Sequence, residues 1–409
     1  MIDHSGSKNP FNIIVIVAAL GYFVDIYDLI LFGIVKDPSL RGIGVKEEDL
    51  FTVGIHLLDM QMIGMLIGGI IWGILGDKKG RLSTLFLTIL LYSSANIANG
   101  FVKTVEQYEW LRFIAGLGLA GELGIGITLV AEVMTKESRG IGTSIVSGIG
   151  ILGAVLGFLV ADIFDWRMAY FVGGGLGLLL LALRISVYES GMFEQIKAEK
   201  VKRGDFLSLF TSVTRFKKYL LCIFIGIPVW FVISQLTINA PAYAKNALGI
   251  VGTVTGAMAV TLHYIGASFG SLLFGYISEK LKSRKKSLLL AITSLLLFCI
   301  FYFSSFGLSA NIFYLFITLT GISMGGLWAV FMTVSSEAFG TNLRATVTTT
   351  APNFVRGTTV LISYCIATLK PEYGLWTAGV IVGTVCITLS FIGLLSLKDS
   401  YGKELNYSE

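Results

Sequence analysis

The stretch "FNIIVIVAALGYFVDIYDLILFGIV" (residues 11–35) contains only two charged side chains, Asp25 and Asp28. An α-helix needs about 20 apolar residues, each rising 1.5 Å, to cross the hydrocarbon core of a bilayer. The stretch is longer than this, and it predicts a membrane-spanning helix. Asp25 and Asp28 are three positions apart, so they share one helix face with Gly21 and Phe32. We expect this face to point away from lipid, because a carboxylate in a bilayer is costly unless a cavity or a partner receives it.

The composition is typical of a polytopic membrane protein. Of the 409 residues, 54% are hydrophobic and 14% are charged, whereas soluble domains hold about 25% charged residues. The 48 glycines favour closely packed helices over a β-barrel. The net charge of +5 comes from basic residues in short loops between apolar runs, so it does not indicate nucleic-acid binding. The four cysteines lack the spacing of a metal site, and we expect neither a metal nor a cofactor.

Apolar runs along the whole chain predict an all-α fold with twelve transmembrane helices. The predicted spans are residues 11–35, 51–75, 82–101, 107–133, 140–162, 168–188, 219–244, 252–278, 287–306, 311–337, 346–369 and 374–396. Lysines and arginines collect in the loops that follow the even-numbered spans, at 78–81, 136–139, 197–218, 280–286 and 344. The positive-inside rule therefore places these loops and both termini in the cytoplasm. We expect an integral protein of a bacterial plasma membrane.

The chain divides near its middle into two similar halves. The long polar stretch "ESGMFEQIKAEKVKRGDF" (189–206) follows the sixth span, and it predicts a six-helix bundle at 1–188, a linker at 189–218 and a second bundle at 219–409. The segment 116–140 aligns without gaps with 321–345, so that Gly116 meets Gly321, Glu132 meets Glu337 and Arg139 meets Arg344. Parallel repeats of this kind place a substrate site at the repeat interface near mid-membrane.

A short basic loop connects the second span to the third. "GDKKGRLSTL" (76–85) resembles the signature loop of the major facilitator superfamily, and "GYISEKLKSRKKS" (275–287) is a degenerate echo in the second half. The resemblance implies a cytoplasmic latch in which Asp77 pairs with an arginine and with the N-terminus of a neighbouring helix. An ordinary positive-inside loop is the alternative. The candidate gating residues are Asp77, Arg81, Glu132, Arg139, Glu337 and Arg344.

The fourth span carries two ionisable residues. "LRFIAGLGLAGE" (111–122) resembles the fourth-helix motif of the same family, in which the arginine, here Arg112, is associated with proton coupling. Asp59 lies at a similar depth in the second span, so the two depths permit a pair across adjacent helices, either for coupling or as a structural ion pair.

Three acids at similar depth form a candidate proton site. "GLAGE" (118–122) and "GYFVDIYDL" (21–29) resemble the metabolite:proton and phosphate:proton symporter branches of the family. The resemblance and the burial of Asp25, Asp28 and Glu122 together predict that these acids load and release protons. Hydrogen-bonded structural carboxyls are the alternative.

The second half supplies a cation at mid-depth. Arg356 in the eleventh span cannot lose its proton, so it needs an anionic partner. An anionic substrate and a first-half acid are both candidates, and we favour the substrate because the guanidinium fork suits a carboxylate or phosphate. His263 in the eighth span is a weaker candidate, since a lone interior histidine is more often a hydrogen-bonding group. Further candidate pocket residues are Tyr22, Gln235, Asn239, Trp328 and Asn353.

Two departures from related branches narrow the function. "GIGILGAVLG" (148–157) lacks the proline typical of the family's drug antiporters, which favours symport. Leu123 stands where the phosphate branch usually has tyrosine, and 219–244 contains no acid, which disfavours phosphate. We expect a monomeric proton-coupled importer of a small polar metabolite that carries a carboxylate, such as an organic acid or amino acid. The alternatives are a proton-driven efflux antiporter and a membrane sensor that does not transport. Nothing in the sequence resembles an enzyme site.

Overall fold

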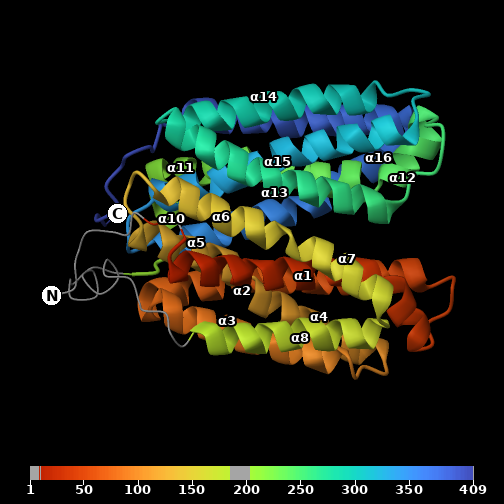
Figure 1. Ribbon diagram of the computed structural model, residues 1–409, viewed down its shortest axis with the longest axis horizontal. Coiled ribbons are helices and arrows are strands. Elements are labelled where there is room, and N and C mark those ends of the chain that lie inside the picture. Colours follow the sequence, from red (N-terminus) through yellow and green to blue (C-terminus); the bar gives the residue numbers. More distant parts are fainter. Residues whose placement is uncertain (1–8, 10, 185–202, 409) are drawn as a thin grey trace.

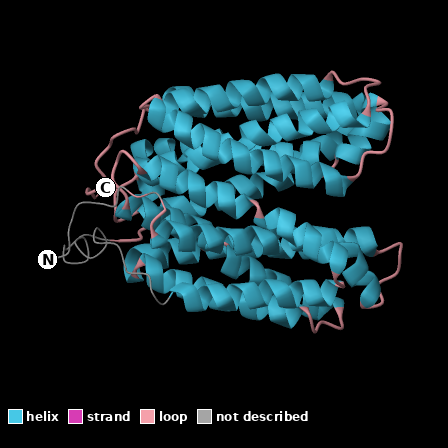
Figure 2. Ribbon diagram, viewed as in Figure 1, coloured by secondary structure: helices cyan, strands magenta, loops and turns pink. Residues whose placement is uncertain are grey.

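The computed structural model describes residue 9 and residues 11–184 and 203–408, and these form helices joined by loops (Figure 2). The first half contains α1 (Ile13–Gly42), α2 (Leu50–Lys79), α3 (Arg81–Asn99), α4 (Val105–Leu119), α5 (Glu122–Val133), α6 (Arg139–Ile151), α7 (Gly153–Ile163) and α8 (Trp166–Leu183). The second half contains α10 (Ser208–Thr211), α11 (Val213–Phe231), η2 (Val232–Thr237), α12 (Ala240–Tyr243), η3 (Ala244–Leu248), α13 (Gly256–Lys280), α14 (Arg284–Phe303), α15 (Ala310–Ala338) and α16 (Arg344–Ser396).

The number of membrane passes follows from helix length. In the described part of the chain, 11 helical segments are long and apolar enough to cross a membrane. One of them, α16, has 53 residues and would be about 80 Å long if it were straight, far more than a bilayer of about 30 Å. It contains Pro371 and breaks at Gly374, whose φ of 78° lies in the left-handed region. α16 is therefore two passes, and the expectation of twelve transmembrane helices is confirmed.

The helices form two bundles, which we call the N-bundle (α1–α8) and the C-bundle (α11–α16). Figure 1 shows them as two layers, with the red-to-yellow helices in one and the green-to-blue helices in the other. Within the N-bundle α2 packs on α4 and α3 on α8, while within the C-bundle α13 packs on α15 and α11 on α16. The most extensive contacts between the bundles are those of α6 with α13 and of α2 with α16, and α5 and α7 also contact the C-bundle.

Glycines at equivalent positions of the two halves permit the closest of these contacts. A Cβ on Gly116 would overlap the backbone carbonyl of Gln61, and a Cβ on Gly321 would overlap that of His263. Small residues allow helix backbones to approach in membranes, where packing replaces the hydrophobic effect as the driving force. The aligned glycines thus support the same helix contact in each bundle, as the sequence repeat predicts.

Three spans are interrupted near their middle. The fourth span breaks at Ala120 and Gly121, so that Glu122 starts α5, and the fifth breaks at Leu152 between α6 and α7. In the seventh span, Pro228 lies inside α11 and the chain continues as the π-helix η2. Helix interruptions and π-turns leave backbone groups outside the regular pattern, and they often occur at functional sites. The predicted linker at 189–218 lies partly outside the described residues, and α11 begins inside it at Val213.

Candidate functional site

Two buried carboxyl groups lie on the face of α1 that points toward the C-bundle and the N-bundle interior. Asp25 is 0% exposed and Asp28 is 1% exposed. Their four carboxyl oxygens have no hydrogen-bond partner among the described residues. Asp25 faces Arg356 of the C-bundle, with 3.9 Å between Oδ2 and Nη2. Asp28 faces Arg112 inside the N-bundle. Each acid therefore lies near one arginine, but neither acid forms a short ion pair with its arginine.

Arg356 projects from α16 and is 3% exposed. Its Nη1 donates to Oδ1 of Asn353 at 3.2 Å, while its Nε has no partner among the described residues. The Nδ2 of Asn353 donates in turn to the carbonyl of Ala120 at 2.9 Å, which is the carbonyl at the break between α4 and α5. The distance to Asp25 is long for an ion pair. The guanidinium thus keeps donor capacity for another anion, and both partners expected from the sequence remain available.

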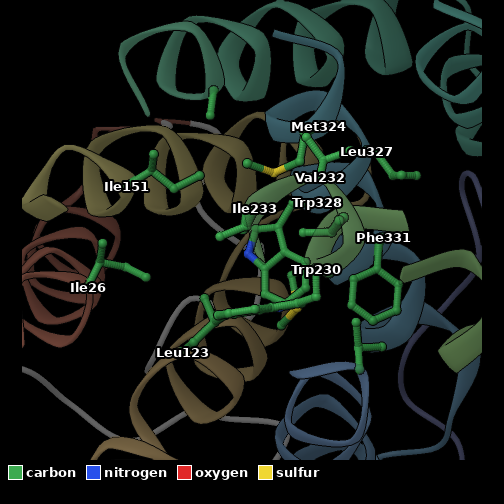
Figure 3. Close-up of a cluster of buried hydrophobic side chains, with 14 of the residues drawn as sticks. Ile26, Leu123, Ile151, Trp230, Val232, Ile233, Met324, Leu327, Trp328 and Phe331 are labelled. Atoms are coloured by element: carbon green, nitrogen blue, oxygen red, sulfur yellow. The ribbon is translucent and has the colours of Figure 1, made fainter. Parts of the chain in front are cut away.

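Aromatic side chains from both bundles surround this cation. Nε1 of Trp328, in α15, donates to the hydroxyl of Tyr22 at 3.1 Å, which joins the C-bundle to α1. Tyr22 and Tyr264 both lie near Arg356. Figure 3 shows the Trp328 ring between Leu123 of α5, Trp230 of α11 and Phe331 of α15. The bond from Trp328 to Tyr22 thus links this apolar and aromatic cluster to the surroundings of Arg356.

Glu122 has a partner that the sequence analysis missed. Nη1 of Arg184 donates to its Oε2 at 3.1 Å, and Nη2 of Arg184 donates to its Oε1. Both side chains are 1% exposed. A Cβ on Gly21 would overlap both groups, so the glycine in α1 makes room for the pair. Arg184 lies near the end of the sixth predicted span, residues 168–188, and its position as a lone charge in that apolar run was a usable signal.

The structure does not bring Asp59 and Arg112 together, although their places in the sequence permitted a pair. Asp59 is exposed on α2, and its charged neighbour is His56. Arg112 is fully buried, with its guanidinium carbon 4.8 Å from the Phe32 ring centre, and it lies near Asp28. Side chains two residues apart on a helix point in nearly opposite directions, so the place of Asp59 along α2 does not tell which way its side chain faces. The two side chains therefore lie on helix faces that do not meet.

Three other candidates occupy different surroundings. His263 is buried within the C-bundle, where α13 packs on α15 and its ring lies against Tyr264. It is the neighbouring Tyr264 that lies near Arg356. Gln235 donates to Ser363 at 3.1 Å, and the exposed Asn239 donates to Gln235 at 3.4 Å. Gln235 and Asn239 thus hold the end of the seventh span rather than contact the cation.

The latch end is the end of the bundles where α2 ends and α16 begins. Here Asp77 of α2 is fully buried and accepts three hydrogen bonds from the C-bundle. The donors are the backbone N–H of Ala345 at 3.0 Å, that of Thr346 at 2.8 Å, and the Thr346 hydroxyl at 2.7 Å. Ala345 and Thr346 belong to the first turn of α16, where unpaired N–H groups favour an anion. The bond of Asp77 to a helix N-terminus, expected from the loop motif, is present.

A buried ion network continues the latch. Both oxygens of Glu132 accept from Arg81 of the same bundle, at 2.8 and 3.1 Å. Arg344 of the C-bundle donates to Glu132 Oε1 at 2.8 Å. Arg81 also donates across the interface to the carbonyl of Thr341 at 2.9 Å. Glu132 is therefore shared between one arginine from each bundle.

The second half repeats this arrangement with Arg284 in the place of Arg81. Arg284 donates to Glu337 at 3.1 and 3.3 Å and to Glu279 at 2.8 Å. Arg139 of the N-bundle lies 3.9 Å from Glu337. All six candidate gating residues thus meet at the latch end. Arg284 was not among them, although its place in the echo loop at 275–287 was a usable signal.

These features were compared with known proteins. A sequence model of the Major Facilitator Superfamily matches residues 13–357. The chain belongs to the Major Facilitator Superfamily. It is 24% identical over 400 residues, 93% of this chain and 89% of the relative, to a protein of Cupriavidus pinatubonensis named as a probable 4-methylmuconolactone transporter. It is 26% identical over 297 residues, 70% of each chain, to the sialic acid transporter NanX of Escherichia coli.

A solved structure supports the same fold. The proton:xylose symporter XylE superposes with a TM-score of 0.76 at 17% identity, covering 96% of this chain and 97% of that chain. The protein is accordingly an integral membrane transporter of small metabolites and not an enzyme. In the part of the chain that the structure describes, no group of His, Cys, Asp or Glu side chains could hold a metal ion.

Proposed function

We propose that the protein is a proton-coupled symporter that imports a small metabolite carrying a carboxylate. The observation that carries this proposal is the placement of Arg356 opposite Asp25. A permanent cation and a buried acid face each other across the two bundles at 3.9 Å, and the acid has no hydrogen bond. An arrangement of this kind can take up one anion and one proton together.

The coupling follows from competition for one guanidinium. While Arg356 faces Asp25, its charge offsets the cost of a buried carboxylate. A substrate carboxylate that binds Arg356 forms the ion pair with its guanidinium in place of Asp25. Asp25 is then more stable as a neutral acid, because an uncompensated charge in a dry interior is far more costly than a neutral group. Substrate binding thus favours proton binding, and Asp28, beside Arg112, is the next acid that can take the proton.

The same surroundings support the substrate class. Arg356 offers a planar fork of donors, Tyr22 and Tyr264 lie beside it, and the cluster shown in Figure 3 is apolar and aromatic. Surroundings of this kind suit a compact anion with an apolar body. Sialic acid and 4-methylmuconolactone, the compounds in the names of two relatives, both carry a carboxylic acid.

The latch supplies the conformational part of the proposal. With both termini in the cytoplasm, the latch end faces inward, and the buried contacts there describe a state closed to the cytoplasm. Transport then alternates between this state and one in which the N-bundle, residues 1–188, separates from the C-bundle, residues 219–409, at the latch end. The segment 189–218 links the two, and the transporter works as a monomer in a bacterial plasma membrane.

The test is proton-driven accumulation of a carboxylate in proteoliposomes. The substrate is first found by screening organic acids and amino acids for thermal stabilisation of the purified protein. Asp25→Asn and Asp28→Asn should abolish accumulation driven by a pH gradient and retain exchange of labelled for unlabelled substrate. Asp162→Asn, at an exposed acid of α7, is the matched control. Normal accumulation in both variants would overturn the proton assignment.

A further inference from the structure

The chain continues past α16 as a segment at the latch end, which contacts the start of α6 and carries the C-terminus label in Figure 1. We call residues 398–408 the C-terminal segment. Asp399 accepts from the backbone N–H of Arg284 at 3.0 Å and from the hydroxyl of Ser283, so it fixes the start of α14. Ser400 donates to Glu337 at 2.6 Å. The first residues of the segment are therefore bound to the C-bundle part of the ion network.

The middle of the segment is bound to Arg344. Leu405 is 0% exposed, and its carbonyl accepts from Arg344 Nη2 at 2.6 Å and from the Thr341 hydroxyl at 3.0 Å. The Thr341 N–H donates to the carbonyl of Tyr407 at 2.8 Å. The other nitrogens of Arg344 donate to the carbonyl of Ser336 at 3.0 Å and to Glu132. The segment thus supplies one of the three partners that hold this guanidinium.

The segment also reaches the N-bundle. Arg139 Nη1 donates to the carbonyl of Lys403 at 3.2 Å, and Lys136 Nζ lies 3.0 Å from Glu404 Oε1. The Lys136–Glu404 pair is 45% and 79% exposed, and exposed pairs of this kind contribute little. Arg139 is 3% exposed, so its bond to the segment is the stronger tie. A segment attached covalently to the C-bundle therefore holds a buried arginine of the N-bundle.

We propose that the C-terminal segment is a strap that stabilises the closed latch. It orients Arg344 toward Glu132 and binds Arg139 from the opposite bundle, so the latch cannot open until the Arg139 and Lys136 contacts break. In the open state water can solvate these groups, whereas in the closed state the loss of the segment leaves buried guanidinium groups short of acceptors. Removal of the segment therefore favours opening. The strap goes beyond the proposed function, because it depends on neither the substrate nor the coupling ion.

The test uses a cysteine buried in the closed latch. Thr348 is 0% exposed and its hydroxyl lies 2.5 Å from that of Thr128 across the interface. Thr348→Cys is introduced together with Cys365→Ser, since Cys365 is the exposed native thiol and the other three are buried. Labelling by a maleimide in purified protein then reports opening of the latch. Deletion of residues 402–409 should raise the labelling rate roughly tenfold, the scale of one hydrogen bond to a charged group. It should leave helix content unchanged.

A point variant and a crosslink keep the result unambiguous. Leu405→Asp expels a buried side chain of the segment and should raise labelling as the deletion does, whereas Ser408→Asp, at an exposed position, should not. A bifunctional thiol reagent joining Lys136→Cys to Glu404→Cys should lower labelling at position 348. If labelling is unchanged in the folded deletion or after crosslinking, the strap is refuted. No substrate is present in this assay, so failure of the proposed symport would leave its outcome unaffected.

Discussion

Replacement of Asp77 by asparagine removes the charge at the centre of the latch. Asp77 accepts three hydrogen bonds from the start of α16. A hydrogen bond to a charged group contributes about 1.5–3 kcal/mol, and asparagine keeps one acceptor oxygen without the charge. The expected loss is about 2 kcal/mol from the closed state, which is ~30-fold in the ratio of open to closed protein. Arg81 keeps its bonds to Glu132, so the N-bundle should remain folded.

The assay is maleimide labelling of Thr348→Cys in the purified protein. The thiol reacts only when the latch opens, so the labelling rate follows the open fraction. Asp77→Asn should increase this rate ~30-fold on the same energy scale and slow transport, while substrate still binds. Lys78→Asn, one residue further on and exposed, is the control and should leave the rate unchanged. An unchanged rate in Asp77→Asn would refute the latch, and loss of binding together with transport would indicate misfolding.

Four further substitutions test separate parts of the molecule. Arg356→Lys keeps the charge but loses the two-pronged guanidinium, so the affinity for a carboxylate ligand should fall by about 1–3 kcal/mol. The affinity for the matching amide should change less. Equal losses of affinity would make Arg356 a structural counter-ion. Glu122→Gln removes the negative charge that faces the buried Arg184, so thermal denaturation should show a loss of about 3–5 kcal/mol, and an unchanged melting temperature would contradict the pair. Gly124→Ala places a Cβ against the C-bundle, so it should favour the open latch by about 1–3 kcal/mol, as measured by thiol labelling. Gly116→Ala places a Cβ within the N-bundle, so it should lower thermal stability instead. The reverse pattern would contradict the packing.

The fold was predictable because a bilayer imposes length on every span. Apolar runs predicted the number of passes, and the break at Gly374 inside α16 coincides with the first residue of the last predicted span. The breaks inside spans were not predictable from hydropathy. Ala120 and Leu152 are apolar residues within apolar runs, and at the first break the Ala120 carbonyl accepts from Asn353, a contact that hydropathy does not report.

The candidate site was predictable where a charge stands alone in an apolar run. Asp25, Asp28 and Arg356 stood out for this reason, and the structure brings Arg356 to Asp25. The partner of a charge was harder to predict, because it depends on which way each helix is rotated. Asp59 is exposed because of the way α2 is rotated, and Arg184, near the end of the sixth predicted span, was not selected as the partner of Glu122.

The C-terminal segment carried no sequence signal for its role. Its contacts to Arg344 and Arg139 are made by the backbone carbonyls of Leu405 and Lys403, and any residue has a carbonyl. Repetition between the halves indicated Arg344 and Arg139 as gating residues. It could not indicate a partner that lies outside the repeat.

The most direct test of the central claim is the direction of proton movement when substrate enters. Purified protein is placed in liposomes that enclose a pH-sensitive dye, and a carboxylate substrate is added outside without an imposed pH gradient. Symport predicts that the lumen becomes more acidic as labelled substrate accumulates, and that both changes disappear in Asp25→Asn. A lumen that becomes more alkaline as substrate enters would indicate antiport. Substrate entry with no change in pH would contradict proton coupling altogether.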